Sequence, residues 1–204
     1  MRINPNHVIK ISGSGENASY VDLSGGPYIY SRVPAEQLAE QIFATRGIPF
    51  VRLDNRHPVF VPVEQIVTMS FAPGRGHVSG GMGSVSFETE RWESVRDEII
   101  SKTTCHWISF ALVGGKHGGT KDELIHVRSD RISAVESVPA GRKKVFSALR
   151  IAGEKTYSVP SKIVVVSPLE EVERLIGETF RREDRDGIGN QPEVLPSGMI
   201  EVPE

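Results

Sequence analysis

The feature that most constrains the fold is an amphipathic helix pattern that occurs three times along the chain. The copy at residues 167–176 also carries a start signal, because Ser167 can cap the first turn, Pro168 suits the first helical position and Glu170 can bond back to the cap. Apolar side chains with helical spacing form one stripe in each copy. The three stripes are Leu169, Val172 and Ile176, then Ala35, Leu38 and Ile42, and finally Trp92, Val95 and Ile99.

Short alternating strands lie between these segments, and together they predict a strand–strand–helix unit in tandem copies. We expect the helices at residues 34–45, 91–102 and 168–176. Internal spacing supports the repeat in two places. The step from Ile66 to Met69 recurs from Ile132 to Val135, and the spacing of residues 5–12 recurs at residues 160–167. The alternative interpretation is chance similarity among short amphipathic strands.

The predicted fold class is therefore α+β, mostly β, with tandem small antiparallel β modules that are each closed by one short amphipathic helix. Tandem repetition allows units too small to fold alone to share a core. The expected boundaries are 1–47 for the first β-β-α repeat, 48–104 for the second, 105–182 for an expanded third repeat and 183–204 for a flexible C-terminal tail.

The charge balance argues against a protein whose affinity comes mainly from neutralising phosphates. Lys and Arg number 24 against 26 Asp and Glu, and neither half of the chain has a positive excess. The single cysteine, Cys105, excludes an internal disulfide. No signal-peptide core or membrane-spanning apolar run occurs in the sequence. We expect a soluble protein of the cytoplasm, or a component of an assembly built inside the cell.

The repeated unit resembles the small flagellar motility proteins of the FlbD/SwrD type. The resemblance is carried by the strand at residues 132–137 with the helix at 167–176, and by residues 66–69 with residues 93–99. These segments match a pattern of an Ile-x-x-Ile strand, a Gly turn and a helix introduced by Glu/Ser-x-x-Glu-Val. Membership would imply a non-enzymatic interaction partner. The present chain departs from the pattern by its tandem repetition and by an insertion at 158–166.

Residues 1–100 also resemble a LytTR-type DNA-binding domain in the order of their elements. The segment 50–57, Phe-Val-Arg-Leu-Asp-Asn-Arg-His, is comparable with the family's Phe-x-Arg-x-His-Arg-Ser strand. Asp54 replaces the family's histidine and Pro62 stands near its asparagine, so a carboxylate would face the phosphates. The resemblance implies Arg52 and Arg56 as base- or phosphate-reading residues.

Two glycine-rich segments, 73–83 and 114–122, are predicted to be mobile loops between strands. A dinucleotide loop must open a helix, but a strand follows the first segment, and Thr120 follows the last glycine of the second where a phosphate loop needs lysine. Both loops remain candidates to order on a partner or to hold a small ligand or nucleotide. Their expected contact residues are Arg75, His77, Lys116 and Lys121.

No residue pattern predicts catalysis, a metal or a cofactor. Residues 54–57 are more typical of a hairpin turn than of a catalytic cluster. The histidines lack zinc-site spacing, and the segment from Asp184 lacks the later ligands of a calcium loop. Cys105 and His106 are adjacent on an expected strand, so their side chains point to opposite faces and cannot form a thiolate–imidazole pair. We interpret Cys105 as structural.

The preferred hypothesis is a non-enzymatic protein-binding or assembly protein, with a protein partner or self-assembly. The tail supports it, because Met199, Ile200 and Val202 alternate like an edge strand that can extend a neighbouring sheet. The first alternative is a LytTR-like DNA-binding module that uses Arg52 and Arg56 with the basic loop Arg142, Lys143 and Lys144. The second alternative is a small-ligand or nucleotide binder that uses the glycine-rich loops.

Overall fold

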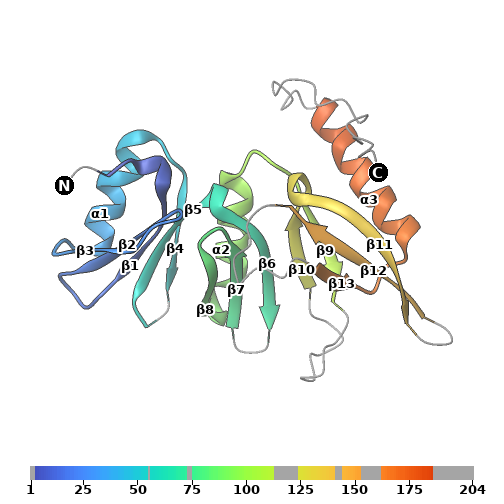
Figure 1. The fold of residues 1–204 in the computed structure, drawn as a ribbon, viewed down its shortest axis with the longest axis horizontal. Helices are drawn as coiled ribbons and strands as arrows, with labels where there is room; N and C mark the ends of the chain where they lie inside the picture. The colour runs from blue at the N-terminus through green and yellow to red at the C-terminus, as the bar shows by residue number, and fades with distance from the viewer. Residues whose placement is uncertain are drawn as a thin grey trace, which may run out of the picture.

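The structure is a computed structural model that describes residues 3–54, 56–72, 75–112, 124–140, 144–152 and 162–185. Three antiparallel sheets follow one another along the molecule in this part of the chain, and each is accompanied by one α-helix (Figure 1). The predicted fold class, α+β and mostly β with small antiparallel sheets, is confirmed.

The first sheet has the strand order β3-β2-β1-β5-β4, so the chain returns after its helix to pair with its own first strand. A turn at Gly47, whose left-handed φ of 66° suits glycine, redirects the chain from the helix into β4. The elements are β1 (Val8–Gly13), β2 (Ser19–Leu23), β3 (Ile29–Ser31), α1 (Ala35–Ile42), β4 (Phe50–Asp54) and β5 (Pro58–Pro62).

The second sheet repeats this topology strand for strand, with the order β8-β7-β6-β10-β9. Its first strand, β6, pairs with β7 on one side and with the returning β10 on the other. The elements are β6 (Ile66–Ala72), β7 (Arg75–Gly80), β8 (Gly83–Glu88), α2 (Trp92–Lys102), β9 (Trp107–Ala111) and β10 (Leu124–Arg128).

The third sheet contains the counterparts of the first three strands and the helix, in the order β11-β12-β13. An isolated bridge between Leu112 and Val165 joins it to the end of β9. The elements are β11 (Ile132–Ala140), β12 (Lys144–Ile151), β13 (Lys162–Val165) and α3 (Leu169–Arg185). The described chain therefore holds two full copies of a β-β-β-α-β-β unit and the first four elements of a third.

Hydrogen bonds and strand irregularities repeat at equivalent positions, which places the three copies in register. A single 3-10 turn precedes each first strand: η1 (Pro5–His7), η3 (Val63–Gln65) and η5 (Ser129–Arg131). The carbonyl of the last residue in each turn accepts a hydrogen bond from the backbone N–H of the residue that follows the second strand of the same unit. The N–H of Ser24 donates to His7 at 2.8 Å, that of Gly81 to Gln65 at 3.0 Å and that of Ala152 to Arg131 at 2.7 Å. The pairing of the first two strands shifts register at Val8/Lys10, Ile66/Thr68 and Ile132/Ala134.

The hairpins that follow α1 and α2 are buried on both faces, and each serves two cores. On the β4–β5 hairpin, Phe50 and Phe60 pack into the first core, whereas Val51, Leu53 and Val61 pack into the second. The β9–β10 hairpin does the same, with Trp107 against the second core and a row of apolar residues in the third: Ile108, Phe110, Ile125 and Val127. Successive units are therefore joined by shared hydrophobic cores.

The predicted helical stripes are the buried faces of the helices. Ala35 and Ala39 of α1 are buried, with Leu38 and Ile42 packed against the same core. Trp92, Val95 and Ile99, the three apolar residues predicted for the stripe of the second helix, are all buried in α2. In α3, Val172 is buried and Ile176 packs beside it, but the helix continues to Arg185, beyond the predicted end at residue 176.

Three expectations need correction. The hairpins 50–62 and 107–128 pair with the sheets that precede them, so the sheets divide the chain after β5 and after β10, and not at residues 47 and 104. The spacing match of residues 5–12 with 160–167 is not the structural equivalence, because β1 corresponds to β11 by its turn and its register shift. Residues 75–80 form the strand β7, so this part of the first glycine-rich segment is not a loop.

The glycines of β7 are required by packing. A Cβ at Gly76 would collide with the ring of Phe87, and one at Gly80 would collide with the backbone carbonyl of Gln65. The flexible appearance of the segment in the sequence thus comes from positions at which the sheet leaves no room for a side chain.

We expect Gly80→Ala to lower the free energy of unfolding by about 1–3 kcal/mol, because the backbone of Gln65 cannot move aside as a flexible side chain would. Gly177→Ala in α3 is the matched control. Its added methyl group meets only the far end of Arg181 at 3.9 Å, so it should raise stability by about 0.5–1 kcal/mol. Urea unfolding followed by circular dichroism measures both, and equal effects would contradict the packing argument.

Candidate functional site: the open edge of the third sheet

The outer edge of β11 is the position at which the third sheet departs from the first two. In the first sheet β1 pairs with β2 and also with β5, where Ile11 lies opposite Phe60. In the second, β6 pairs with β7 and also with β10, where Met69 lies opposite His126. β11 pairs with β12, and no strand of the described chain lies on its other side. We call this side of β11 the open edge.

The repeated register shift identifies which residues of the open edge correspond to paired residues elsewhere. Ala134, Val135 and Glu136 stand where Thr68, Met69 and Ser70 stand in β6. In the second sheet these three positions are opposite Val127, His126 and Ile125 of the returning strand. An unpaired row of backbone N–H and C=O groups at such an edge is a template for another strand.

The side chains of the open edge do little to block strand addition. Natural edges are protected by lysine, proline or short length. Residues 132–138 contain neither lysine nor proline and a single charge, Glu136, and the one proline of β11, Pro139, stands next to the last residue of the strand. That charge is paired with Arg150 of β12 on the adjoining strand. Ser133, Ala134 and Ser137 are exposed, while Val135 is half-buried against the third core.

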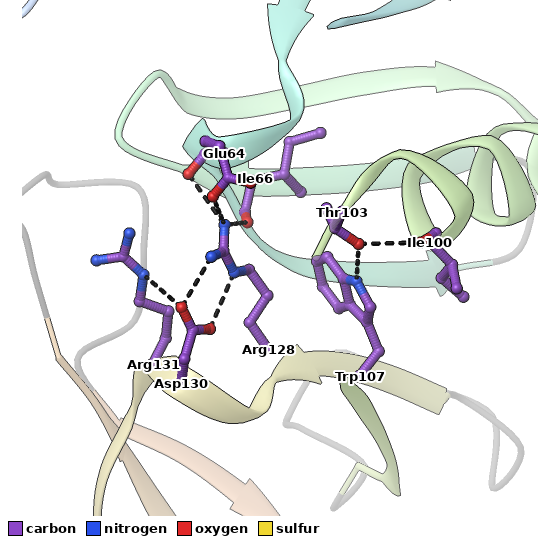
Figure 2. Close-up of polar contacts among 8 residues, drawn as sticks. All are labelled: Glu64, Ile66, Ile100, Thr103, Trp107, Arg128, Asp130 and Arg131. Atoms are coloured by element: carbon purple, nitrogen blue, oxygen red, sulfur yellow. Dashed lines mark hydrogen bonds and ion pairs between the residues drawn. The ribbon is translucent and has the colours of Figure 1, made fainter. Parts of the chain in front are cut away.

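The start of β11 is held in place by Arg128, whose side chain is only 4% exposed. Figure 2 shows its guanidinium between the turn before β6 and the turn before β11. Nη1 donates to the backbone carbonyl of Glu64 at 3.1 Å and lies 3.0 Å from the Glu64 carboxylate. Nε and Nη2 donate to the two carboxylate oxygens of Asp130 at 3.0 and 2.8 Å.

This clamp keeps Arg128 charged. Burial alone would lower the pKa of its guanidinium, but the hydrogen bonds and negative charge of Asp130, with a further contribution from Glu64, raise it. A bidentate pair of this kind fixes orientation as well as distance. The open edge therefore begins from a rigid anchor that joins the second and third units.

Cys105 lies beside this clamp and is not a reactive thiol. Its side chain is half-buried, and burial raises the pKa of the Cys105 thiol to about 11. The charge of Arg128 lowers this pKa by a smaller amount, and the carboxylates of Asp130 and Glu64 raise it. A buried thiol with a high pKa contains little thiolate at neutral pH, and only the thiolate is nucleophilic. The structural interpretation of Cys105 agrees with this environment.

The tyrosine face, formed by Tyr20, Tyr28 and Tyr30, is a second exposed surface. It lies on the first sheet beside its edge strand β3. The three side chains are 36%, 67% and 54% exposed, and the ring of Tyr20 packs against the other two at centroid distances of 5.3 and 5.5 Å. Tyr20 and Tyr28 line a shallow hollow with Ser12 and with Asp22, which forms an ion pair with Lys10 at 2.8 Å.

Arg52 and Arg56, the two arginines of the DNA-binding alternative on the first sheet, lie in different surroundings. Arg52 donates to Asp54 at 2.7 Å and to Glu36 at 3.2 Å, so its charge is matched by carboxylates, and the hydrogen bond to Asp54 raises its pKa. Asp54 also pairs with Arg91. Arg56 is exposed in the turn between β4 and β5. Hence Arg52 presents no unopposed positive charge to a phosphate.

The remaining predicted site residues fall into two groups. On β7, Arg75 is exposed at the start of the strand, and the ring of His77 is 2.9 Å from the hydroxyl of Ser86. Lys144 is the first residue of β12. The other predicted contact residues lie outside the described part of the chain: Lys116, Lys121, Arg142, Lys143, Met199, Ile200 and Val202.

Within the described ranges, no group of three or more His, Cys, Asp or Glu side chains is arranged to hold a metal ion. None of the helices described is long and apolar enough to cross a membrane.

Comparison of the chain with protein-family models, with curated proteins and with solved structures finds no match. The interpretation of the open edge therefore depends on the internal repeat.

We expect Arg128→Ala to lower the free energy of unfolding by about 2–3 kcal/mol, because it removes charge-assisted hydrogen bonds from a buried site. Arg174→Ala, which breaks the exposed pair with Glu178 on α3, should cost less than about 0.5 kcal/mol. Chemical unfolding of both variants checks this, and a loss of the same size in both would contradict the clamp.

A second prediction concerns His126, whose ring lies 5.9 Å from that of Trp92 and 2.7 Å from the hydroxyl of Ser109. Burial, and to a lesser degree Arg96, lowers the pKa of His126 below its ordinary value of 6.5. The unfolded chain therefore binds a proton that the folded chain does not, so stability falls as the pH drops below that value. His126→Gln should flatten the dependence of Tm on pH from 7 to 5, and an unchanged slope would contradict this role.

Proposed function

We propose that this protein is a non-enzymatic binding or assembly protein whose main contact surface is the open edge of β11. The observation that carries the proposal is topological. The first strand of a unit is paired on both sides in the first two sheets, whereas β11 is paired on one side among the described strands. A partner segment in extended conformation fits this position by adding a strand to the sheet.

The physical basis is β-augmentation, in which main-chain hydrogen bonds supply affinity and alternate side chains supply specificity. At the equivalent place in the first unit, the returning strand carries Phe60, which is buried in the first core. In the second unit it carries His126, whose ring lies beside Trp92 of the second core. A segment bound beside Val135 would place an apolar or aromatic residue there. The resemblance to FlbD/SwrD-type proteins also favours an interaction role.

Neither alternative has a comparable observation in its favour. The DNA-binding alternative uses Arg52 and Arg56 with the basic loop 142–144, and of these Arg52 is already paired with Asp54 and Glu36. The ligand-binding alternative depends in part on a loop at residues 75–80, which belong to β7. We therefore keep the binding or assembly function as the proposal.

A photo-crosslinking amino acid at Ser137, which is exposed on β11, tests the proposal in cells that make the protein. We expect a discrete adduct, and we expect the crosslink to map to a residue of the partner segment that lies beside β11. The same probe at Ser101, exposed on α2, should give no such adduct. Equal adducts from both positions would contradict a specific surface.

Ala134→Lys supplies the matched loss of function, because a lysine is a natural means of protecting an edge against strand addition. We expect it to reduce the Ser137 adduct by about tenfold or more, which corresponds to about 1.4 kcal/mol of binding free energy. Ser101→Lys adds the same charge to α2 and should leave the adduct unchanged. An adduct that survives Ala134→Lys would place the contact elsewhere.

A further inference from the structure

The residues that follow α3 repeat a pattern found in the residues that follow α1. Gly187-Ile188 matches Gly47-Ile48, and Met199-Ile200 comes at the same separation after that pair as Val59-Phe60 does in the first unit. The residues between them differ, since 190–192 are Asn-Gln-Pro where β4 begins with Phe-Val-Arg. The similarity therefore concerns the turn and the returning strand.

In the first unit these matched residues direct the chain back onto its own sheet. Gly47 has a left-handed φ of 66°, and the N–H of Ile48 donates to the carbonyl of Phe43 at 3.0 Å. The chain then returns as β5, where Phe60 is buried in the first core and lies opposite Ile11 of β1. This return covers the edge of β1 that corresponds to the open edge of β11.

The same pairing on β11 is chemically consistent. Val135 is the counterpart of Ile11. The pair of Phe60 with Ile11 would therefore correspond to Ile200 opposite Val135. Antiparallel alternation would then direct Ile200 and Val202 to the core side of the sheet and Glu201 to the other. It would also carry Glu204 toward Arg131, whose side chain is 39% exposed.

We propose that residues 199–202 of this same chain occupy the open edge of β11 as the counterpart of β5. They regulate the site, because a partner strand must displace them before it can pair. The regulatory part of this inference rests on the proposed function, whereas the pairing itself rests on the repeat. Two other outcomes compete with this proposal: a second copy of the chain pairs with β11, or no segment of the chain pairs with it.

Hydrogen–deuterium exchange of three chains tests the pairing: residues 1–204, the truncation 1–186, and full-length Ile200→Asp. We expect the β11 amides at 133–138 to exchange at least about tenfold faster in the last two. The β6 amides, which are paired on both sides, serve as the internal control and should be unchanged. Ser197→Asp is the matched control, because it adds the same charge before the pairing residues.

Unchanged β11 exchange in both altered chains would overturn the pairing, and the point variant gives an answer even where the truncation does not fold. Light scattering on the full chain separates the occupants. A monomer with protected β11 amides supports pairing within one chain, whereas protection confined to dimers overturns it in favour of exchange between copies.

The inference and the proposed function fail in different ways. Faster β11 exchange in Ile200→Asp without any increase in the Ser137 adduct supports the pairing and overturns partner binding at this edge. An adduct obtained with unchanged β11 exchange overturns the pairing and leaves partner binding supported. If both hold, Ile200→Asp should increase the adduct severalfold, because the edge is freed.

Discussion

The whole structure depends on hairpins whose two faces are both buried. The β4–β5 hairpin places Phe60 in the first core and Val51 and Val61 in the second. Its strands also complete the first sheet through the pairing of β5 with β1. Each such hairpin therefore closes the sheet before it and supports the helix after it. A unit of this size is only marginally stable alone, and the shared hairpins add apolar burial that holds the units together.

The helices could be predicted from the sequence because their signal is local. The 3.6-residue period of Trp92, Val95 and Ile99 needs no knowledge of the partner surface. The strand β7 could not be recognised, since Gly76 and Gly80 are typical of loops unless Phe87 and Gln65 are known to lie against them. The unit boundaries failed for the same reason. Nothing near β5 in the sequence shows that it pairs with β1.

The candidate site was even less accessible to sequence reasoning. An edge is open because no neighbouring strand pairs with it. Pairing between strands that are far apart in the sequence can be seen only in the complete sheet. Arg128 illustrates the difficulty, because it ends an apolar strand and its backbone partner Glu64 is 64 residues away. A signal was present in the repeated steps at Ile66 and Ile132, which are the first residues of equivalent strands. The alternation in the tail pointed toward strand addition but not toward its place.

The open edge follows from the repeat and needs no separate design. In a row of units, each first strand is covered by the hairpin that comes after its helix, so among the described strands β11 is paired on one side alone. The bridge between Leu112 and Val165 shows that the third unit is joined to the second through β13, which is at the opposite side of its sheet from β11. The β13 side of the third sheet therefore contacts the second unit, while the Arg128 clamp holds the start of β11. Ala134 is exposed on β11, so substitutions there leave the cores that hold the units together undisturbed.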